Sequence, residues 1–241
     1  MGKLLVRGML AGLLAAVFAF AFASVFGEPQ VDNAIAVEES AAPHEHGASE
    51  EELVSRGTQS TVGLATAVGA YGLAFGGMFA LAFAFAYGRI GNLSARATAG
   101  VLAVGAFLVV FLVPYLKYPA NPPAVGNPDT INERTTLYFV TVLISLVVAV
   151  LAIVLARRLT DRLGSWNAIL LGALGYVVVM AVVALLLPRI NEVPEGFPAS
   201  LLWNFRLASL GTQLVLWTAI GLIFGVFTER RVRRVAATRP L

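Results

Sequence analysis

The sequence predicts an all-α membrane protein, a polytopic bundle of six transmembrane helices with both termini in the cytoplasm. Its composition indicates the class: 58% of the 241 residues are hydrophobic and 13% are charged, against about 25% charged residues in soluble domains. Six uncharged intervals reach the roughly 20 residues that a helix needs to cross a bilayer. The basic residues also alternate between the two sides in step with six crossings.

The spans follow from the longest intervals that contain no charged residue and no histidine. They are expected at residues 8–27, 61–87, 97–116, 136–156, 165–187 and 207–228. The start of the chain also resembles a signal peptide, with Lys3 and Arg7 before an apolar run and Ala21-Phe22-Ala23 near its end. That run is longer than the usual cleaved core, so we expect the first span to be retained.

Basic residues set the orientation of the bundle. Six crossings with both ends inside put 12 of the 17 basic residues on the cytoplasmic side and 5 on the outer side, as the positive-inside rule requires. Of the 14 acidic residues, only Asp161 and Glu229 fall inside. The basic tail is expected to face anionic lipid. This accounts for the basic character of the chain, and no nucleic-acid partner is needed to explain it. Its residues are Arg230, Arg231, Arg233 and Arg234.

Small residues recur at a spacing that lets transmembrane helices approach closely. Three spans carry a Gly-x-x-x-Gly pair. The pairs are Gly8 and Gly12, Gly72 and Gly76, and Gly221 and Gly225. The pattern favours packing within the chain, and the alternative is an interface with a partner or with a second copy.

The outer segment 28–56, expected as a long acidic loop, holds eight acidic residues, a single base and both histidines of the protein. His44 and His46 flank Glu45, and in extended backbone residues two apart face the same way. Imidazole and carboxylate together suit cobalt, nickel, copper or zinc. The segment is therefore a candidate metal-capture site at His44, Glu45 and His46. The alternative is a solvated acidic loop with incidental histidines.

The expected spans contain few side chains that could bind a metal, carry an ion or catalyse a reaction. None contains a histidine or a charged residue, which excludes bis-histidine haem and counts against a solitary ion pump. The chain has no cysteine, and we expect no tightly bound cofactor and no enzymatic activity. Most polar side chains within the spans are expected to pack or hydrogen-bond between helices. The candidates for an intramembrane polar path are Gln213, Ser209 and Tyr71.

Two outer loops, at residues 114–134 and 188–206, are rich in proline and in charges of both signs. Proline restricts its own φ and the residue before it, so these loops are expected to be stiff. One interpretation is a structural lid cross-linked by ion pairs. The other is a vestibule that attracts cations through its four acidic residues, Asp129, Glu133, Glu192 and Glu195.

Four strings of residues resemble the CbtA family, the probable cobalt transporter subunits. They are LVPYLKYPANPPAVG at 112–126, ERTTLYF at 133–139, EVPEGFPA at 192–199 and LWNFRLAS at 202–209. The resemblance covers essentially the whole chain. It implies a multi-pass permease component of the bacterial inner membrane, with Co²⁺ as cargo and a small single-span partner that carries its own histidines.

The family is often described with about five spans, whereas the charge pattern here requires six. A homo-oligomer is a further expectation, because the spans lack charged groups of their own. The alternative function is a non-catalytic structural or assembly subunit of a larger membrane complex, to which apolar cores and small-residue faces are equally suited.

Overall fold

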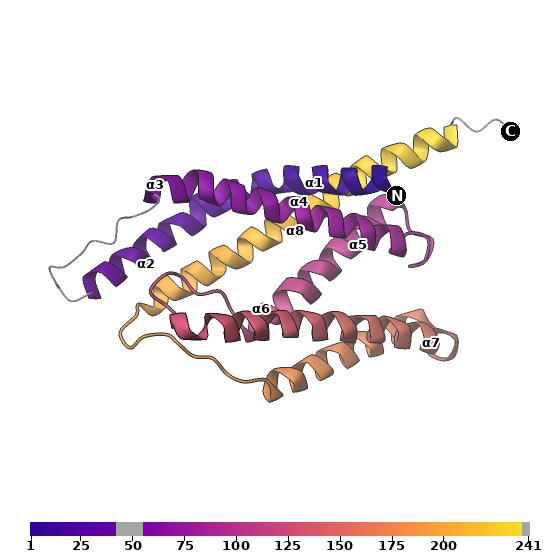
Figure 1. Ribbon diagram of the computed structural model, residues 1–241. Helices are drawn as coiled ribbons and strands as arrows, with labels where there is room; N and C mark the ends of the chain where they lie inside the picture. The colour runs from indigo at the N-terminus through magenta and orange to yellow at the C-terminus, as the bar shows by residue number, and fades with distance from the viewer. Residues whose placement is uncertain (42–54, 238–241) are drawn as a thin grey trace. The chain divides into compact units, whose positions relative to one another are not determined.

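The computed structural model describes residues 1–41 and 55–237, and every regular element in those residues is helical (Figure 1). Within these described residues, five helices are long and apolar enough to cross a membrane: Gly2–Ser40, Arg56–Ala86, Ala95–Lys117, Pro128–Leu186 and Ala199–Arg230. The chain forms two compact units. Unit 1 comprises Met1–Phe107, Pro122–Ala124 and Pro198–Leu241, and unit 2 comprises Leu108–Asn121 and Val125–Phe197.

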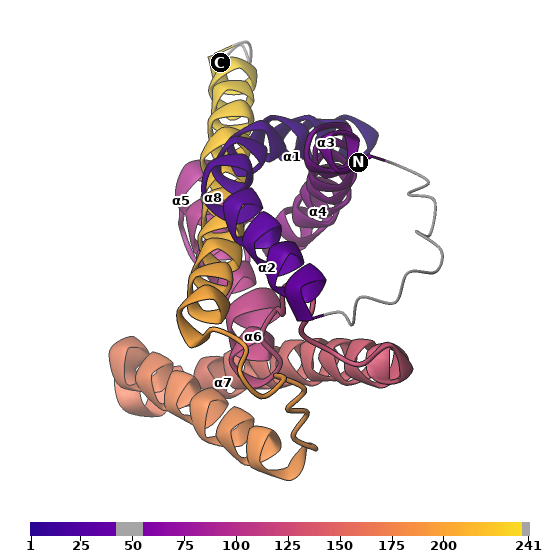
Figure 2. The ribbon, with the colours of Figure 1, turned by 90° about the vertical axis from the view of Figure 1, so that its left-hand side faces the viewer.

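Unit 1 is built on four long helical segments. The first is α1 (Gly2–Phe22), which continues through the π-helix η1 (Ala23–Gly27) into α2 (Glu28–Ala41). The second comprises α3 (Arg56–Thr58), the π-helix η2 (Gln59–Gly63) and α4 (Leu64–Ala86). The others are α5 (Ala95–Ala106) and α8 (Ala199–Ala237). Helix α1 lies against both α4 and α8, and α8 also lies against α5 (Figure 2).

Glycine brings α1 and α4 into backbone contact. A Cβ added to Gly12 would lie 1.9 Å from the carbonyl oxygen of Gly72, and one added to Gly8 would lie 2.2 Å from that of Gly76. On α8, a Cβ at Gly221 would lie 2.5 Å from the Cβ of Ala103. All three Gly-x-x-x-Gly pairs therefore serve packing inside the chain, which confirms the interpretation favoured by the sequence.

Aromatic side chains fill the space between α4 and α8. The ring of Phe224, fully buried, meets Phe79 and Phe83 edge to face, with centroids 5.4 and 5.0 Å apart. One side of Trp217 is covered in the same way by Phe75, at 5.3 Å. Such edge-to-face pairs add to the stabilisation that burial itself gives, so they fix the rotation of α8 against α4.

Unit 2 is built on the π-helix η3 (Phe107–Leu112), α6 (Val113–Lys117), the short 3₁₀-helix η4 (Pro128–Thr130) and α7 (Ile131–Leu186). As a straight rod, the 56 residues of α7 would be about 84 Å long, almost three times the thickness of the hydrocarbon core. Helix α7 is not straight. Gly164 has φ 74° and ψ 158°, and the chain folds back there (Figure 1).

The two arms of α7 lie side by side. A Cβ added to Gly172 in the second arm would lie 2.9 Å from the carbonyl oxygen of Ala152 in the first. The arms correspond to the fourth and fifth spans expected from the sequence, 136–156 and 165–187. Both arms belong to one of the five long apolar helices of the described residues, Pro128–Leu186, and the six crossings stay a prediction.

Two of the three π-helices stand just before a proline. Gly27 ends η1 two residues before Pro29, and Leu112 ends η3 two residues before Pro114. A proline in a helix has no N–H to donate and its ring presses on the carbonyl four residues earlier, and a π turn is one of the local adjustments that relieves this. The helices can therefore run through these prolines instead of ending.

The acidic segment differs from the expected loop for this reason. Residues 28–41 form α2, in direct continuation of α1, so the first half of segment 28–56 is helical. The proposed metal ligands His44, Glu45 and His46 lie outside the described residues.

Candidate functional site

The only base of the acidic segment holds its two ends together. Arg56, at the start of α3, donates through Nη2 to Glu28 and through Nε to Asp32, the latter at 3.0 Å. The side chain of Glu28 is 16% exposed and that of Asp32 is 60% exposed. Two of the eight acidic residues are thus ion-paired with Arg56. Glu38 and Glu39 on α2 remain exposed to solvent.

In unit 2, Glu192 joins the two proline-rich loops. One carboxylate oxygen accepts the hydroxyl proton of Thr130, and the other accepts the backbone N–H of Asn127 at 3.0 Å. The guanidinium Nε of Arg134 lies 3.3 Å from that second oxygen. We call this group, made of Asn127, Thr130, Arg134 and Glu192, the Glu192 clamp.

The clamp lowers the pKa of Glu192 and leaves room only for glycine at position 126. The hydrogen bond from Thr130, the one from the Asn127 backbone and the charge of Arg134 lower the pKa of Glu192 below its usual 4.5, against the opposing effect of burial. Gly126 has φ +132°, and a Cβ there would lie 2.7 Å from Nη1 of Arg134. The guanidinium therefore rests on backbone that only glycine leaves uncovered.

A second connection lies at the same end of unit 2. The ammonium of Lys117, in the last turn of α6, donates to the carbonyl oxygens of Ala184 and Leu187 at 2.7 and 2.9 Å. The hydroxyl of Tyr118 donates to the carbonyl oxygen of Pro188 at 2.9 Å. The last carbonyls of a helix have no partner within it and carry partial negative charge, so a lysine there satisfies both needs.

A polar node lies within the apolar part of unit 2. Ser145, fully buried on the first arm of α7, donates to the carbonyl oxygen of Val109 in η3 at 2.6 Å. The hydroxyl of Tyr176 on the second arm lies 2.7 Å from Ser145 Oγ. Because Ser145 gives its proton to Val109, Tyr176 is the donor in the second bond.

The cause of this node is Pro114. In the i→i+5 pattern of a π-helix, the carbonyl of Val109 would accept from residue 114, which is proline and has no N–H. An unpaired backbone carbonyl in an apolar environment is costly. Ser145 supplies the missing donor and so ties η3 to both arms of α7.

Comparison with known protein families identifies the family to which this chain belongs. A family model described as "Probable cobalt transporter subunit (CbtA)" matches residues 1–229, nearly the whole length. The chain belongs to the CbtA family. It is therefore a multi-pass membrane protein of a cobalt-transport family, as the resemblance in its loops predicts. No curated protein and no solved structure matches this CbtA chain.

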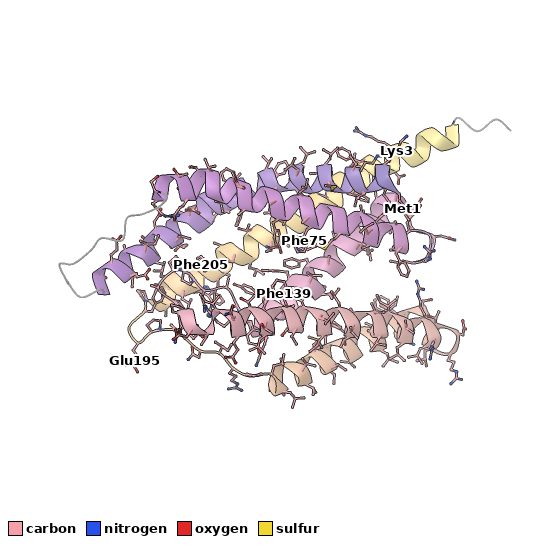
Figure 3. The ribbon with its side chains drawn as sticks, in the orientation of Figure 1. Met1, Lys3, Phe75, Phe139, Glu195 and Phe205 are labelled. Carbon is pink, nitrogen blue, oxygen red and sulfur yellow. The ribbon has the colours of Figure 1, made fainter. Side chains whose placement is uncertain are left out.

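The four candidate vestibule residues of this CbtA chain have different surroundings. Asp129, Glu133 and Glu195 are exposed, and Glu195 projects from its loop (Figure 3). Glu192 differs from the other three because it is engaged in the clamp. Across the described parts of the chain, no three metal-ligating side chains lie together as a metal site would need.

The intramembrane candidates also differ from one another. Ser209 donates to the carbonyl oxygen of Phe205 in its own helix at 3.0 Å. The ring of Tyr71 packs on Phe75 with centroids 4.1 Å apart, and Tyr71 is 38% exposed. Gln213 is distinct, because its Oε1 is buried without a hydrogen-bond partner among the described residues. Sequence reasoning singled out Gln213 but missed Ser145 and Tyr176, since only the fold brings them together at Val109.

The basic tail is helical. Helix α8 runs on to Ala237, so Arg230, Arg231, Arg233 and Arg234 follow one another along its last turns. Arg230 is exposed. Contact of this tail with anionic lipid stays a prediction.

Proposed function

We propose that this protein is the membrane subunit of an uptake system for divalent cations, with cobalt as its cargo, in the bacterial inner membrane. The observation that carries the proposal is the family match over nearly the entire chain. It is supported by the charge distribution, because the acidic groups gather on one side of the predicted bundle and raise the local concentration of cations there.

The proposal includes six crossings, with α7 crossing twice. Its support comes from unit 2, where the Lys117 bond to Leu187 and the Asn127 bond to Glu192 join both ends of α7. Ends that meet on one side of the membrane require an even number of crossings between them. Twelve basic residues against five then orient both termini toward the cytoplasm.

This topology can be tested directly because the chain has no native cysteine. Single-cysteine variants at His44, Asp129, Ser165 and Glu195 would be labelled in intact cells with a membrane-impermeant maleimide. Six crossings predict labelling at positions 44, 129 and 195 and protection at 165. Labelling of positions 129 and 195 from opposite sides would overturn the double crossing of α7.

We assign ion capture to His44, Glu45 and His46, with the exposed Glu38 and Glu39 nearby in sequence. Asp129, Glu133 and Glu195 are proposed to attract the ion at the loops, while Glu192 holds the loops in place. The path is proposed to follow α8 past Ser209 and Gln213, with Tyr71 on α4. Because the spans lack charged side chains, a small single-span partner or a second copy completes the route.

Cobalt uptake into cells at low external concentration tests the capture step. The double variant His44→Ala, His46→Ala is expected to take up less cobalt than the parent, because both imidazole ligands are lost. The matched control is Asn33→Ala, Ser40→Ala, which changes two exposed residues of the same segment without removing a strong ligand. Uptake equal to that of the control would end the capture assignment.

Two measurements distinguish a transport role from an assembly role: native purification of the chain, and cellular cobalt after deletion of the chain. If the protein is part of a cobalt uptake system, deletion should lower cellular cobalt. Recovery of the chain as a fixed component of an enzyme complex, with unchanged cellular cobalt on deletion, would favour the structural alternative.

A further inference from the structure

Two buried polar atoms that lie one helical turn apart on α8 have no hydrogen-bond partner in the part of the chain that the structure describes. They are Oε1 of Gln213, an acceptor, and Nε1 of Trp217, a donor. Trp217 is only 4% exposed. Buried polar groups in proteins are nearly always satisfied, by protein or by ordered water, so a pair of this kind calls for an explanation.

The two side chains share one face of α8. Residues four apart on a helix are neighbours on its surface, and helical side chains lean toward the N-terminus of their helix. The indole of Trp217 therefore leans toward Gln213, and the amide of Gln213 leans toward Ser209 and Leu210. This face is the buried one, since Ile220 and Phe224 continue it and are 0% exposed.

Packing on both sides holds these groups in the interior of unit 1. Phe75 of α4 meets the indole edge to face at an interplanar angle of 84°, which keeps the indole N–H from turning outward. One half-turn beyond Gln213, the ring of Phe22 approaches Gly211 so closely that an added Cβ would lie 2.5 Å from it. Ser24, two residues after Phe22 on η1, has a hydroxyl that is also buried and unpartnered among the described residues.

The geometry points to a hydration site, at which Gln213 and Trp217 hold a water molecule in the apolar interior of unit 1. The pair offers one donor and one acceptor, which favours water over an ion. A bare cation is repelled by the indole N–H, and an anion is repelled by the amide oxygen. Water accepts from Trp217 and donates to Gln213, and it fits equally well if the amide turns its NH₂ group inward.

Buried waters make two to four hydrogen bonds, and Gln213 and Trp217 offer two. The site includes Gln213, which the proposed cobalt path also passes, and the NMR test below detects bound water whether or not the chain moves cobalt. The site also explains why glutamine and tryptophan can be buried together at this depth.

The test uses the purified full chain with a single tryptophan. The sequence contains three, so the variant Trp166→Phe, Trp203→Phe leaves Trp217 alone. With ¹⁵N-labelled tryptophan, a water-selective nuclear Overhauser NMR experiment would detect water beside the only indole N–H. We expect a cross-peak between this N–H and water, and its absence in the folded single-tryptophan protein would overturn the proposal.

Two further variants on the same background define the contact. Gln213→Met keeps the length of the side chain and removes its polar atoms, so the water cross-peak should be lost and the indole resonance should shift. Thr212→Val is the control, because Thr212 donates to the carbonyl oxygen of Ala208 in its own helix at 2.9 Å. A cross-peak that persists unchanged in folded Gln213→Met would refute the assignment to Gln213.

Discussion

The Lys117 ammonium donates a hydrogen bond to the carbonyl oxygen of Leu187, 70 residues further along the chain, at 2.9 Å. The same ammonium reaches Ala184, so one side chain satisfies two carbonyls in the last turn of α7. Together with the Glu192 clamp, this contact joins α6, the two proline-rich loops and both ends of α7. Unit 2 is thus closed at one end by polar contacts.

Replacement of Lys117 by methionine is expected to destabilise the protein. The long apolar stem is kept, but two carbonyls lose a charged donor, and hydrogen bonds to charged groups contribute about 1.5–3 kcal/mol. Thermal unfolding of the purified protein in detergent measures the loss. Arg189→Met removes the same charge from an exposed position and should have little effect. Equal effects of the two variants would assign the loss to net charge instead of to the helix end.

Ser145→Ala is expected to weaken the attachment of η3 to α7. It leaves the carbonyl of Val109 without a donor, because Pro114 offers no N–H, and it removes the acceptor of Tyr176. Hydrogen bonds between transmembrane helices contribute about 0.6 kcal/mol on average and up to about 1.7 kcal/mol. Urea or detergent unfolding should show a loss in this range, with the upper part expected because two bonds are broken.

A matched control for Ser145 lies one turn away. Thr141 is 2% exposed and donates only to the carbonyl oxygen of Leu137 in its own helix, at 2.7 Å. Thr141→Val should therefore cost less than Ser145→Ala. If Tyr176→Phe and Ser145→Ala were fully additive in the double variant, the hydrogen bond between the two residues would carry no coupling energy.

Gly72→Ala tests the close approach of α1 and α4. The new methyl group would lie 2.5 Å from the carbonyl oxygen of Gly12 and 2.8 Å from the Cβ of Ala16, so the helices must separate. Overpacking of this kind costs about 1–3 kcal/mol. Gly69→Ala, three residues earlier, meets only Leu13 at 4.0 Å and should be neutral or stabilising, since alanine is the better helix former. The ratio of folded to aggregated protein on size exclusion and the unfolding midpoint would distinguish the two.

The apolar helices and the fold-back of α7 were predictable because they depend on local properties. Uncharged intervals mark the spans, and the run Arg157, Arg158, Asp161 and Arg162 before Gly164 marks a polar break within what the structure describes as one helix. The internal use of the glycine pairs was also favoured correctly, since such residues bring helices together whatever their partner.

What escaped prediction depends on contacts between distant residues. Pro29 was expected to lie in a loop, but a π turn lets the helix continue to Ala41. Glu192 was one of four equivalent acidic residues in sequence, and only the approach of Asn127, Thr130 and Arg134 sets it apart. The metal ligands proposed at His44 and His46 lie outside the described residues, so they remain a prediction.

The Glu192 clamp predicts a dependence of stability on pH. Because the pKa of Glu192 in the folded protein lies below the usual 4.5, the ionised carboxylate stabilises the fold at pH values above that of the free group. This contribution is lost as the pH falls through the lowered pKa. Glu192→Gln keeps the shape but never carries the charge, so the parent should have a higher Tm at neutral pH and the difference should shrink in acid.

The control for this prediction is Glu195→Gln, which removes an equal charge three residues later at an exposed position. Its Tm difference from the parent should be small and should change little with pH. A difference for Glu192→Gln that stays constant into acid would mean that the clamp depends on shape and neutral hydrogen bonds alone. In that case the charge of Arg134 would contribute nothing to holding the loops, although its Nε lies 3.3 Å from the carboxylate.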